Sequence, residues 1–299
     1  MKKNTLIVSL FICLVSTPAE LMAYKGAAGK NFPPDHTETY KKFGEQDFKL
    51  HFFYPNYQKP TKPTPAIAMF HGGGFSKGSP NAFYYLCHYL ASRGMVGISV
   101  QYRLNNDKVG AVMDGRTALR YIYKNADKYG IDKNKIAAGG GSAGGCLAAA
   151  LSTSTLIHDK TDDMSIPGYP KALVLFNPVY TWKAGKGSPE MRNNFTPSEN
   201  IHADMAPTLV LVGDNDKFLS VQVAKTFQDN MKKVGVRSDL EIYPGATHAF
   251  FTKSQEYVVD TLTKVDIFLT ALGFLSGEPT VEQWHDQNKP NKKAKKKTQ

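Results

Sequence analysis

Residues 136–151 read Ile-Ala-Ala-Gly-Gly-Gly-Ser-Ala-Gly-Gly-Cys-Leu-Ala-Ala-Ala-Leu, and this stretch decides the fold. A short apolar run leads into a cluster of glycines, and an alanine-rich stretch with high helix propensity follows. Between them, Gly140, Ser142 and Gly144 form the pattern G-x-S-x-G, which is typical of a serine held on a sharp turn between a strand and a helix. The pattern also fits a phosphate-binding turn in which Ser142 only caps the helix. The flanking sequence must distinguish these two hypotheses.

From residue 66 onward, segments with strand and helix patterns alternate. Short apolar runs predict buried strands, and apolar residues at helical spacing predict helices. The expected strands are 46–54, 66–70, 96–102, 136–138, 172–176, 208–212 and 240–243, and the expected helices are 80–92, 114–128, 221–234 and 257–272. This alternation predicts an α/β fold in which helices cover both faces of a mostly parallel central sheet. The polar segment 178–200 is too short to form a large lid.

The two ends of the chain differ from its body. Residues 1–23 combine two lysines with the apolar run 6–15 and small residues, which predicts a secretory signal peptide cleaved after Ala19 or Ala23. Residues 288–299 hold six lysines and no acid, which predicts a disordered tail capable at most of weak electrostatic contact with anionic surfaces. The net charge is +11, and without the leader and the tail lysines it is only +4. Residues 24–287 are therefore expected to form one folded domain.

The composition argues against two classes of function. No aromatic residue interrupts the tail lysines, which disfavours nucleic-acid binding. No spacing of cysteine and histidine suggests a metal site. Cys87 and Cys146 both lie in predicted helices among apolar neighbours, so we expect two free, buried thiols rather than a disulfide.

Polar residues that could assist a serine follow two of the predicted strands. Asp214 and Asp216 come directly after the strand 208–212, and His248 follows the strand 240–243. A serine hydroxyl needs a base, and the base needs a carboxylate that orients it. The order serine, acid, histidine along the chain favours nucleophilic catalysis over the phosphate-binding hypothesis.

A third motif, His71-Gly72-Gly73-Gly74, follows the strand 66–70. Consecutive glycines allow several backbone N–H groups to point toward one anion, as an oxyanion hole requires. The alternative interpretation is a flexible glycine turn. His71 is expected to brace this loop and to take no part in proton transfer.

Together these motifs resemble the α/β-hydrolases, in particular the hormone-sensitive-lipase-like and acetylxylan–feruloyl-type esterases, over residues 46–272. The resemblance implies Ser142 as the nucleophile, Asp216 as the orienting acid and His248 as the base. It also implies Gly73, Gly74 and Ala143 as oxyanion donors, with the amide of Ala143 at a helix N-terminus. Asp216 is preferred to Asp214 because Gly213 and Asp216 match the Gly-x-x-Asp pattern. Two features depart from the family pattern: Gly141 stands where many members have an acid, and the long N-terminal cap of the lipase-like members is missing.

The sequence therefore predicts a secreted or periplasmic serine carboxylesterase that needs no cofactor or metal and acts on a small-molecule or glycan ester. Two alternatives remain, a peptidase or amidase of the prolyl-oligopeptidase type and a non-catalytic binding protein of the same fold. The segment 178–200 places Tyr180, Trp182 and Phe195 among polar residues. We expect this aromatic rim to suit a sugar face better than a fatty chain, which favours acetyl or feruloyl-type esters of polysaccharides. The oligomeric state is not determined by the sequence.

Overall fold

The structure is a computed structural model that describes residues 32–288. Both the predicted signal peptide and nearly all of the lysine tail lie outside these residues. The strands are β1 His36–Phe43, β2 Gln46–Phe53, β3 Thr64–Phe70, β4 Val96–Val100, β5 Ile131–Gly141, β6 Leu173–Phe176, β7 Thr208–Gly213 and β8 Ser238–Tyr243. Longer helices are α2 Tyr84–Ser92, α3 Lys108–Lys124, α5 Ala143–Thr153, α7 Val221–Lys233 and α8 Gln255–Ala271. Short ones are α4 Ala126–Tyr129, α6 Pro189–Asn193, α9 Val281–Gln287 and the 3₁₀ turns η1 Pro55–Tyr57, η2 Pro80–Phe83, η3 Pro197–Glu199 and η4 Phe250–Thr252.

Within residues 32–288 the strands form one eight-stranded sheet in the order β1-β2-β4-β3-β5-β6-β7-β8. The pairs β1–β2 and β2–β4 are antiparallel, and all later pairs are parallel, which confirms the predicted mostly parallel sheet. Phe70 pairs with Gly140, and Gly141 pairs with Phe176. This register brings the loops after β3, β5 and β6 to the same edge of the sheet.

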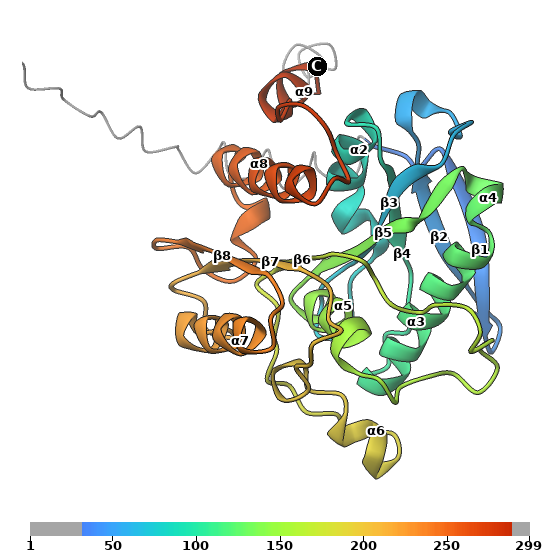
Figure 1. Cartoon of the computed structure of the whole chain (residues 1–299), viewed down its shortest axis with the longest axis vertical. Coiled ribbons are helices and arrows are strands. Elements are labelled where there is room, and N and C mark those ends of the chain that lie inside the picture. Colours follow the sequence, from blue (N-terminus) through green and yellow to red (C-terminus); the bar gives the residue numbers. More distant parts are fainter. Residues whose placement is uncertain (1–31, 289–299) are drawn as a thin grey trace, which may run out of the picture.

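Helices cover both faces of the sheet (Figure 1), and each face has its own apolar core. One core contains side chains of α3, α5 and α7, such as Leu119, Leu147 and Phe227. The other contains side chains of α2, α8 and α9, such as Leu86, Leu262 and Trp284. Because the central strands are buried on both faces, they are continuously apolar, which is why their sequence runs were recognisable. None of the helices in the described part of the chain is both long and apolar enough to span a bilayer.

The clearest differences from the sequence prediction concern β1, α3 and α4; α6 and α9 were also not predicted, and β5 begins at Ile131 instead of 136. The edge strand β1 was not predicted, because only Tyr40 in its polar sequence is buried. Helix α3 begins at Lys108 instead of 114, because the Asp107 carboxylate accepts the Gly110 N–H and caps the helix. It ends at Lys124, and α4 covers the remaining predicted turn up to Gly130, which adopts the left-handed conformation at φ 68°.

Both cysteines of the described residues are buried and free, as predicted. Cys87 lies on α2 and Cys146 on α5. Burial raises the pKa of the Cys146 thiol to about 12, so this group stays protonated and behaves as a small apolar side chain.

Candidate active site

Ser142 occupies the turn between β5 and α5 with φ 53° and ψ −115°, a conformation that non-glycine residues rarely adopt. Its N–H donates to the Phe176 carbonyl at 2.9 Å, which ties the turn to β6. A Cβ on Gly144 would lie 2.0 Å from the Phe70 carbonyl oxygen, and one on Gly140 would lie 2.5 Å from Phe70 O and from Gly144. The two motif glycines are therefore required for the close approach of α5 to β3. This geometry favours a serine held on a sharp turn between strand and helix over a serine that caps the helix, since the Ser142 side chain makes no capping hydrogen bond.

Gly141, the departure from the family pattern, has a local packing reason. A Cβ at this position would lie 2.9 Å from the Phe251 ring and 3.3 Å from the Phe83 ring. These two rings are nearly parallel, at 9°, with centroids 6.0 Å apart. Glycine before Ser142 therefore makes room for an aromatic wall beside the serine.

His248, Asp216 and Ser142 form a continuous hydrogen-bonded chain. His248 Nε2 lies 2.8 Å from Ser142 Oγ, and His248 Nδ1 lies 2.7 Å from Asp216 Oδ2. The side chain of Asp216 is fully buried, and its other oxygen accepts the N–H groups of Phe218 and Leu219 at 2.8 and 3.2 Å. Asp216 can therefore hold the imidazole with Nδ1 protonated and Nε2 free to accept the serine proton.

Asp214, the other candidate acid, is not part of this chain. Its Oδ1 accepts the Gly245 N–H at 2.7 Å, which links the loop after β7 to the turn after β8. The structure thus places Asp216, and not Asp214, against His248.

The glycine loop after β3 lies beside Ser142. Gly73 has φ 119°, and a Cβ there would lie 2.0 Å from the Lys77 carbonyl oxygen, so no other residue fits. Gly73 O accepts the N–H groups of Ser76 and Lys77, and Gly74 and Phe75 also have positive φ, which folds the loop into a tight concave turn. Gly73 and Gly74 line the pocket around Ser142. Ala143 is the first residue of α5 and is buried next to Ser142, but its atoms are not among those that line the pocket.

The buried His71 ring supports the glycine loop after β3. Its Nδ1 lies 2.7 Å from the Gly72 carbonyl, and it stacks on Tyr102 at 4.6 Å. Burial lowers the pKa of His71, so the ring is neutral at pH 7. The Tyr102 hydroxyl donates to His71 O at 2.6 Å and completes the support.

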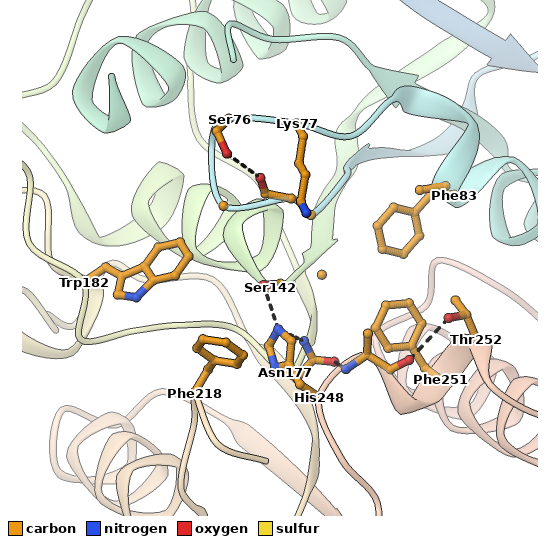
Figure 2. Close-up of a pocket in the computed structure, with 16 residues that line it drawn as sticks. Ser76, Lys77, Phe83, Ser142, Asn177, Trp182, Phe218, His248, Phe251 and Thr252 are labelled. Carbon is orange, nitrogen blue, oxygen red and sulfur yellow. Dashed lines mark hydrogen bonds between the residues drawn. The ribbon is translucent and has the colours of Figure 1, made fainter. Parts of the chain in front are cut away.

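The pocket around Ser142 has a volume of about 580 Å³. Figure 2 shows Trp182 and Phe218 on one side of Ser142 and Phe83 and Phe251 on the other. The remaining lining residues are Gly72, Gly73, Gly74, Ser76, Lys77, Ala82, Gly141, Asn177, His248, Ala249 and Thr252. Four aromatic rings and six polar side chains, Ser142 among them, therefore line the cavity, as in a pocket that binds a small molecule.

The predicted aromatic rim is wrong in two of its three members. Tyr180 and Phe195 are fully buried; Tyr180 stacks face to face on Phe227 of α7 at 4.1 Å, and Phe195 packs edge-on against Phe75. Neither ring can reach a substrate. Trp182 does line the pocket, on the same side of Ser142 as Phe218, which is 60% exposed and tilted against His248 at 4.7 Å. The sequence of segment 178–200 is polar, but Tyr180 and Phe195 are buried because α7 and the glycine loop after β3 cover them.

Sequence reasoning missed several residues of the site, among them Asn177, Phe218 and the two wall residues Phe83 and Phe251. Asn177 follows β6 directly, so the rule that polar residues at strand ends form sites could have found it. Phe218 carries no comparable signal, because a single aromatic residue two positions after Asp216 resembles any loop residue.

A serine that shares a proton with a histidine, beside backbone N–H groups at a helix N-terminus and in a glycine loop, can perform acyl transfer. The comparisons with known proteins agree with this chemistry. The family model BD-FAE matches residues 50–171. Esterase 2 of Thermogutta terrifontis, phosphonylated by cyclosarin, is 32% identical with a TM-score of 0.77, over 81% of this chain and 96% of that one. Other structures of that esterase contain propionate or butyrate.

Two curated proteins are more distant. An AB hydrolase superfamily protein of Schizosaccharomyces pombe is 27% identical, over 77% of this chain and 74% of its own length. An acetylxylan esterase of Xylanibacter ruminicola is 26% identical over 62% of this chain, which spans only 41% of that protein. The fold, the identity to esterase 2 and the near-complete coverage of that protein show that the chain belongs to the α/β-hydrolase superfamily and is one of its serine carboxylic ester hydrolases.

Proposed function

We propose that the chain is an exported serine carboxylesterase that hydrolyses acetyl or feruloyl-type esters, with polysaccharides as the alcohol component. The observation that carries the proposal is the hydrogen-bonded chain from Ser142 through His248 to Asp216 at the base of an aromatic pocket. The acetylxylan esterase relative and the propionate and butyrate in the esterase 2 structures support small acyl groups. No observation favours the prolyl-oligopeptidase type of activity.

In the first half-reaction Ser142 Oγ attacks the ester carbonyl carbon while His248 Nε2 takes the hydroxyl proton. Asp216 stabilises the imidazolium through Nδ1–H. His248 then donates the proton to the leaving alcohol, and the acyl group stays on Ser142. In the second half-reaction His248 takes a proton from water, and the resulting attack releases the acid and restores the serine.

The negative oxygen of each tetrahedral intermediate needs backbone donors. We assign this role to the N–H groups of Gly73, Gly74 and Ala143, because two belong to the concave loop beside Ser142 and the third begins α5. A helix N-terminus adds a favourable partial positive charge. The reaction needs no cofactor, because nucleophile, base and anion donors all belong to the chain.

The substitution Ser142→Ala tests the mechanism. Removal of the nucleophile should lower kcat on a p-nitrophenyl ester by about 10⁶-fold, with an unchanged unfolding temperature as the control for folding. A variant that keeps a large share of the activity would overturn the mechanism.

A series of p-nitrophenyl esters from acetyl to dodecanoyl tests the acyl specificity, together with acetylated and feruloylated xylan. We expect kcat/KM to be highest for the shortest chains, because structures of the related esterase 2 contain the short acids propionate and butyrate. A steady rise toward dodecanoyl would contradict the proposal.

Export is tested by expressing the full-length chain with its first 23 residues and sequencing the N-terminus of the protein recovered outside the cytoplasm. Cleavage after Ala19 or Ala23 is the expected outcome. An intact protein that stays in the cytoplasm would exclude export.

A further inference from the structure

Asn177 follows β6 directly, and its hydrogen bonds reach β7 and the segment after β8. It is fully buried and has φ 35°, a strained value that asparagine tolerates better than most residues. Its N–H donates to the Leu211 carbonyl of β7 at 2.7 Å. The preceding residue, Phe176, accepts the Ser142 N–H at 2.9 Å. The end of β6 therefore holds the backbone of Ser142 and the position of the Asn177 side chain at the same time.

The orientation of the Asn177 carboxamide is set by Ala249. Asn177 Oδ1 accepts the Ala249 N–H at 3.2 Å, so the oxygen must point toward that amide. The NH₂ group then faces His248 Nε2 at 3.4 Å, as Figure 2 shows. Ala249 itself has φ 58°, so Asn177 restrains a strained backbone directly after the histidine.

The NH₂ group of Asn177 contacts His248 Nε2, the same nitrogen that lies within hydrogen-bond distance of Ser142 Oγ. An amide NH₂ can only donate, and its positive end disfavours a second positive charge on the facing nitrogen. We propose that Asn177 is a positioning residue of the esterase reaction, which fixes the His248 ring through Ala249 and presents only a hydrogen-bond donor to Nε2. The inference rests on the function proposed above, in which Nε2 is the general base.

Other charged groups near His248 approach it from different directions. Asp216, on the loop after β7, faces Nδ1 at 2.7 Å. Lys77, on the glycine loop, lines the same pocket, and Lys253, at the end of η4, bonds to the Thr247 hydroxyl. In residues 32–288 the side chains recorded within hydrogen-bond distance of Nε2 are those of Ser142 and Asn177. A change of charge at Asn177 therefore acts on the proton-accepting nitrogen directly.

The substitution Asn177→Asp tests the contact, because it keeps the size and the oxygen that accepts the Ala249 N–H. It replaces the NH₂ group with a carboxylate oxygen, which favours a protonated Nε2. The acid limb of kcat/KM on a neutral ester should therefore move to higher pH by about one to three units, as expected for an opposite charge at such a distance. An unchanged acid limb in a folded variant would overturn the proposal.

Asn177→Ala separates positioning from stability. It should lower kcat by up to about 100-fold with little change in KM, because the ring loses its alignment while the pocket remains. Thr208→Val is the matched control: Thr208 is also fully buried, and its hydroxyl donates to the Ala206 carbonyl at 2.9 Å at the opposite end of β7. This control should lower the unfolding temperature and leave kcat and the pH profile unchanged. If Asn177→Ala behaves in the same way as the control, the role of Asn177 is only structural.

Labelling by paraoxon distinguishes failure of this inference from failure of the proposed function. The activity of the wild-type protein should fall in proportion to the fraction of Ser142 that carries a phosphoryl group. Mass spectrometry should detect one such group per chain. If Ser142 is not labelled, the proposed function fails. If Ser142 is labelled and the Asn177→Asp profile still matches the wild type, only the role of Asn177 is refuted.

Discussion

Asp214 and Asp216 stand two residues apart on the loop after β7, yet their carboxylates have different partners. Asp216 contacts His248 Nδ1, whereas Asp214 accepts the Gly245 N–H. An amide at position 216 would present an NH₂ group to Nδ1 and stabilise the wrong tautomer of the imidazole. An amide at position 214 would still offer an oxygen to Gly245.

We therefore predict that Asp216→Asn lowers kcat by about 10⁴-fold, while Asp214→Asn lowers it by less than about tenfold. The comparison requires both variants on one soluble ester, with unfolding temperatures measured in parallel. A larger loss in Asp214→Asn would show that the orienting acid is assigned to the wrong residue.

At the scale of single elements, the loop after β3 has no space for a side chain at Gly73. Gly73→Ala would place a Cβ against the Lys77 carbonyl and displace the loop that carries two of the proposed oxyanion donors. Loss of one oxyanion donor typically lowers kcat by about 10²- to 10³-fold, and we expect this loss for Gly73→Ala.

Gly44→Ala is the control for this prediction. Gly44 also has positive φ, at 61°, but nothing lies within 4 Å of a Cβ there. It should cost roughly 1–2 kcal/mol of unfolding free energy and leave kcat unchanged. Equal kinetic effects of the two substitutions would exclude a specific role of the Gly73 amide.

The edge strand β1 is joined to the body of the protein by an ion-pair cluster. Lys41 Nζ lies 2.8 Å from Asp114 Oδ1 on α3 and 2.6 Å from Asp159 Oδ2. Burial tends to raise the pKa of Asp159, but the Lys41 ammonium and the Thr161 donors outweigh it and lower this pKa to about 2. Since the folded-state pKa is below the ordinary value of 3.8, the stabilisation is complete above about pH 4 and is lost as the pH falls toward 2.

We predict that Lys41→Met lowers the unfolding free energy at pH 7 by about 2 kcal/mol, because hydrogen bonds between charged groups are lost. The variant should also lose less unfolding free energy than the wild type as the pH falls from 4 to 2. Lys42→Met is the control, since the Lys42 side chain is 78% exposed and lies 3.8 Å from Asp47. Circular dichroism melts between pH 2 and 7 measure both effects. If the two variants melt alike, the cluster does not stabilise β1.

For the whole molecule, the lysine-rich end should be separable from catalysis. The site residues lie between Gly72 and Thr252, and α9 packs its Trp284 into the core before the tail begins. Truncation after Gln287 should therefore leave kcat and KM on a neutral ester unchanged.

A function of the tail should be visible as binding to anionic polysaccharide or anionic vesicles at low salt, which disappears at high salt and after truncation. Co-sedimentation at two salt concentrations tests this. Equal retention of full-length and truncated protein would show that the tail has no such role.

The order of the motifs and the positions of the buried strands were predictable from the sequence, because each depends on residues a few positions apart. The strand–turn–helix pattern around Ser142 and the apolar runs of the central strands are local properties of this kind. They were sufficient to predict the α/β-hydrolase fold and to name the three side chains that meet at the pocket. At α3 only the boundary differed, because the Asp107 cap extends the helix.

Tertiary structure alone decided which residues surround Ser142, His248 and Asp216. Strand β1 exists because it pairs with β2, and Tyr180 and Phe195 are buried because α7 and the glycine loop cover them. Phe218 and Asn177 acquire their contacts with His248 from a residue at least 30 positions away. Such contacts depend on which segments pack against each other, and polarity along the chain does not encode that choice.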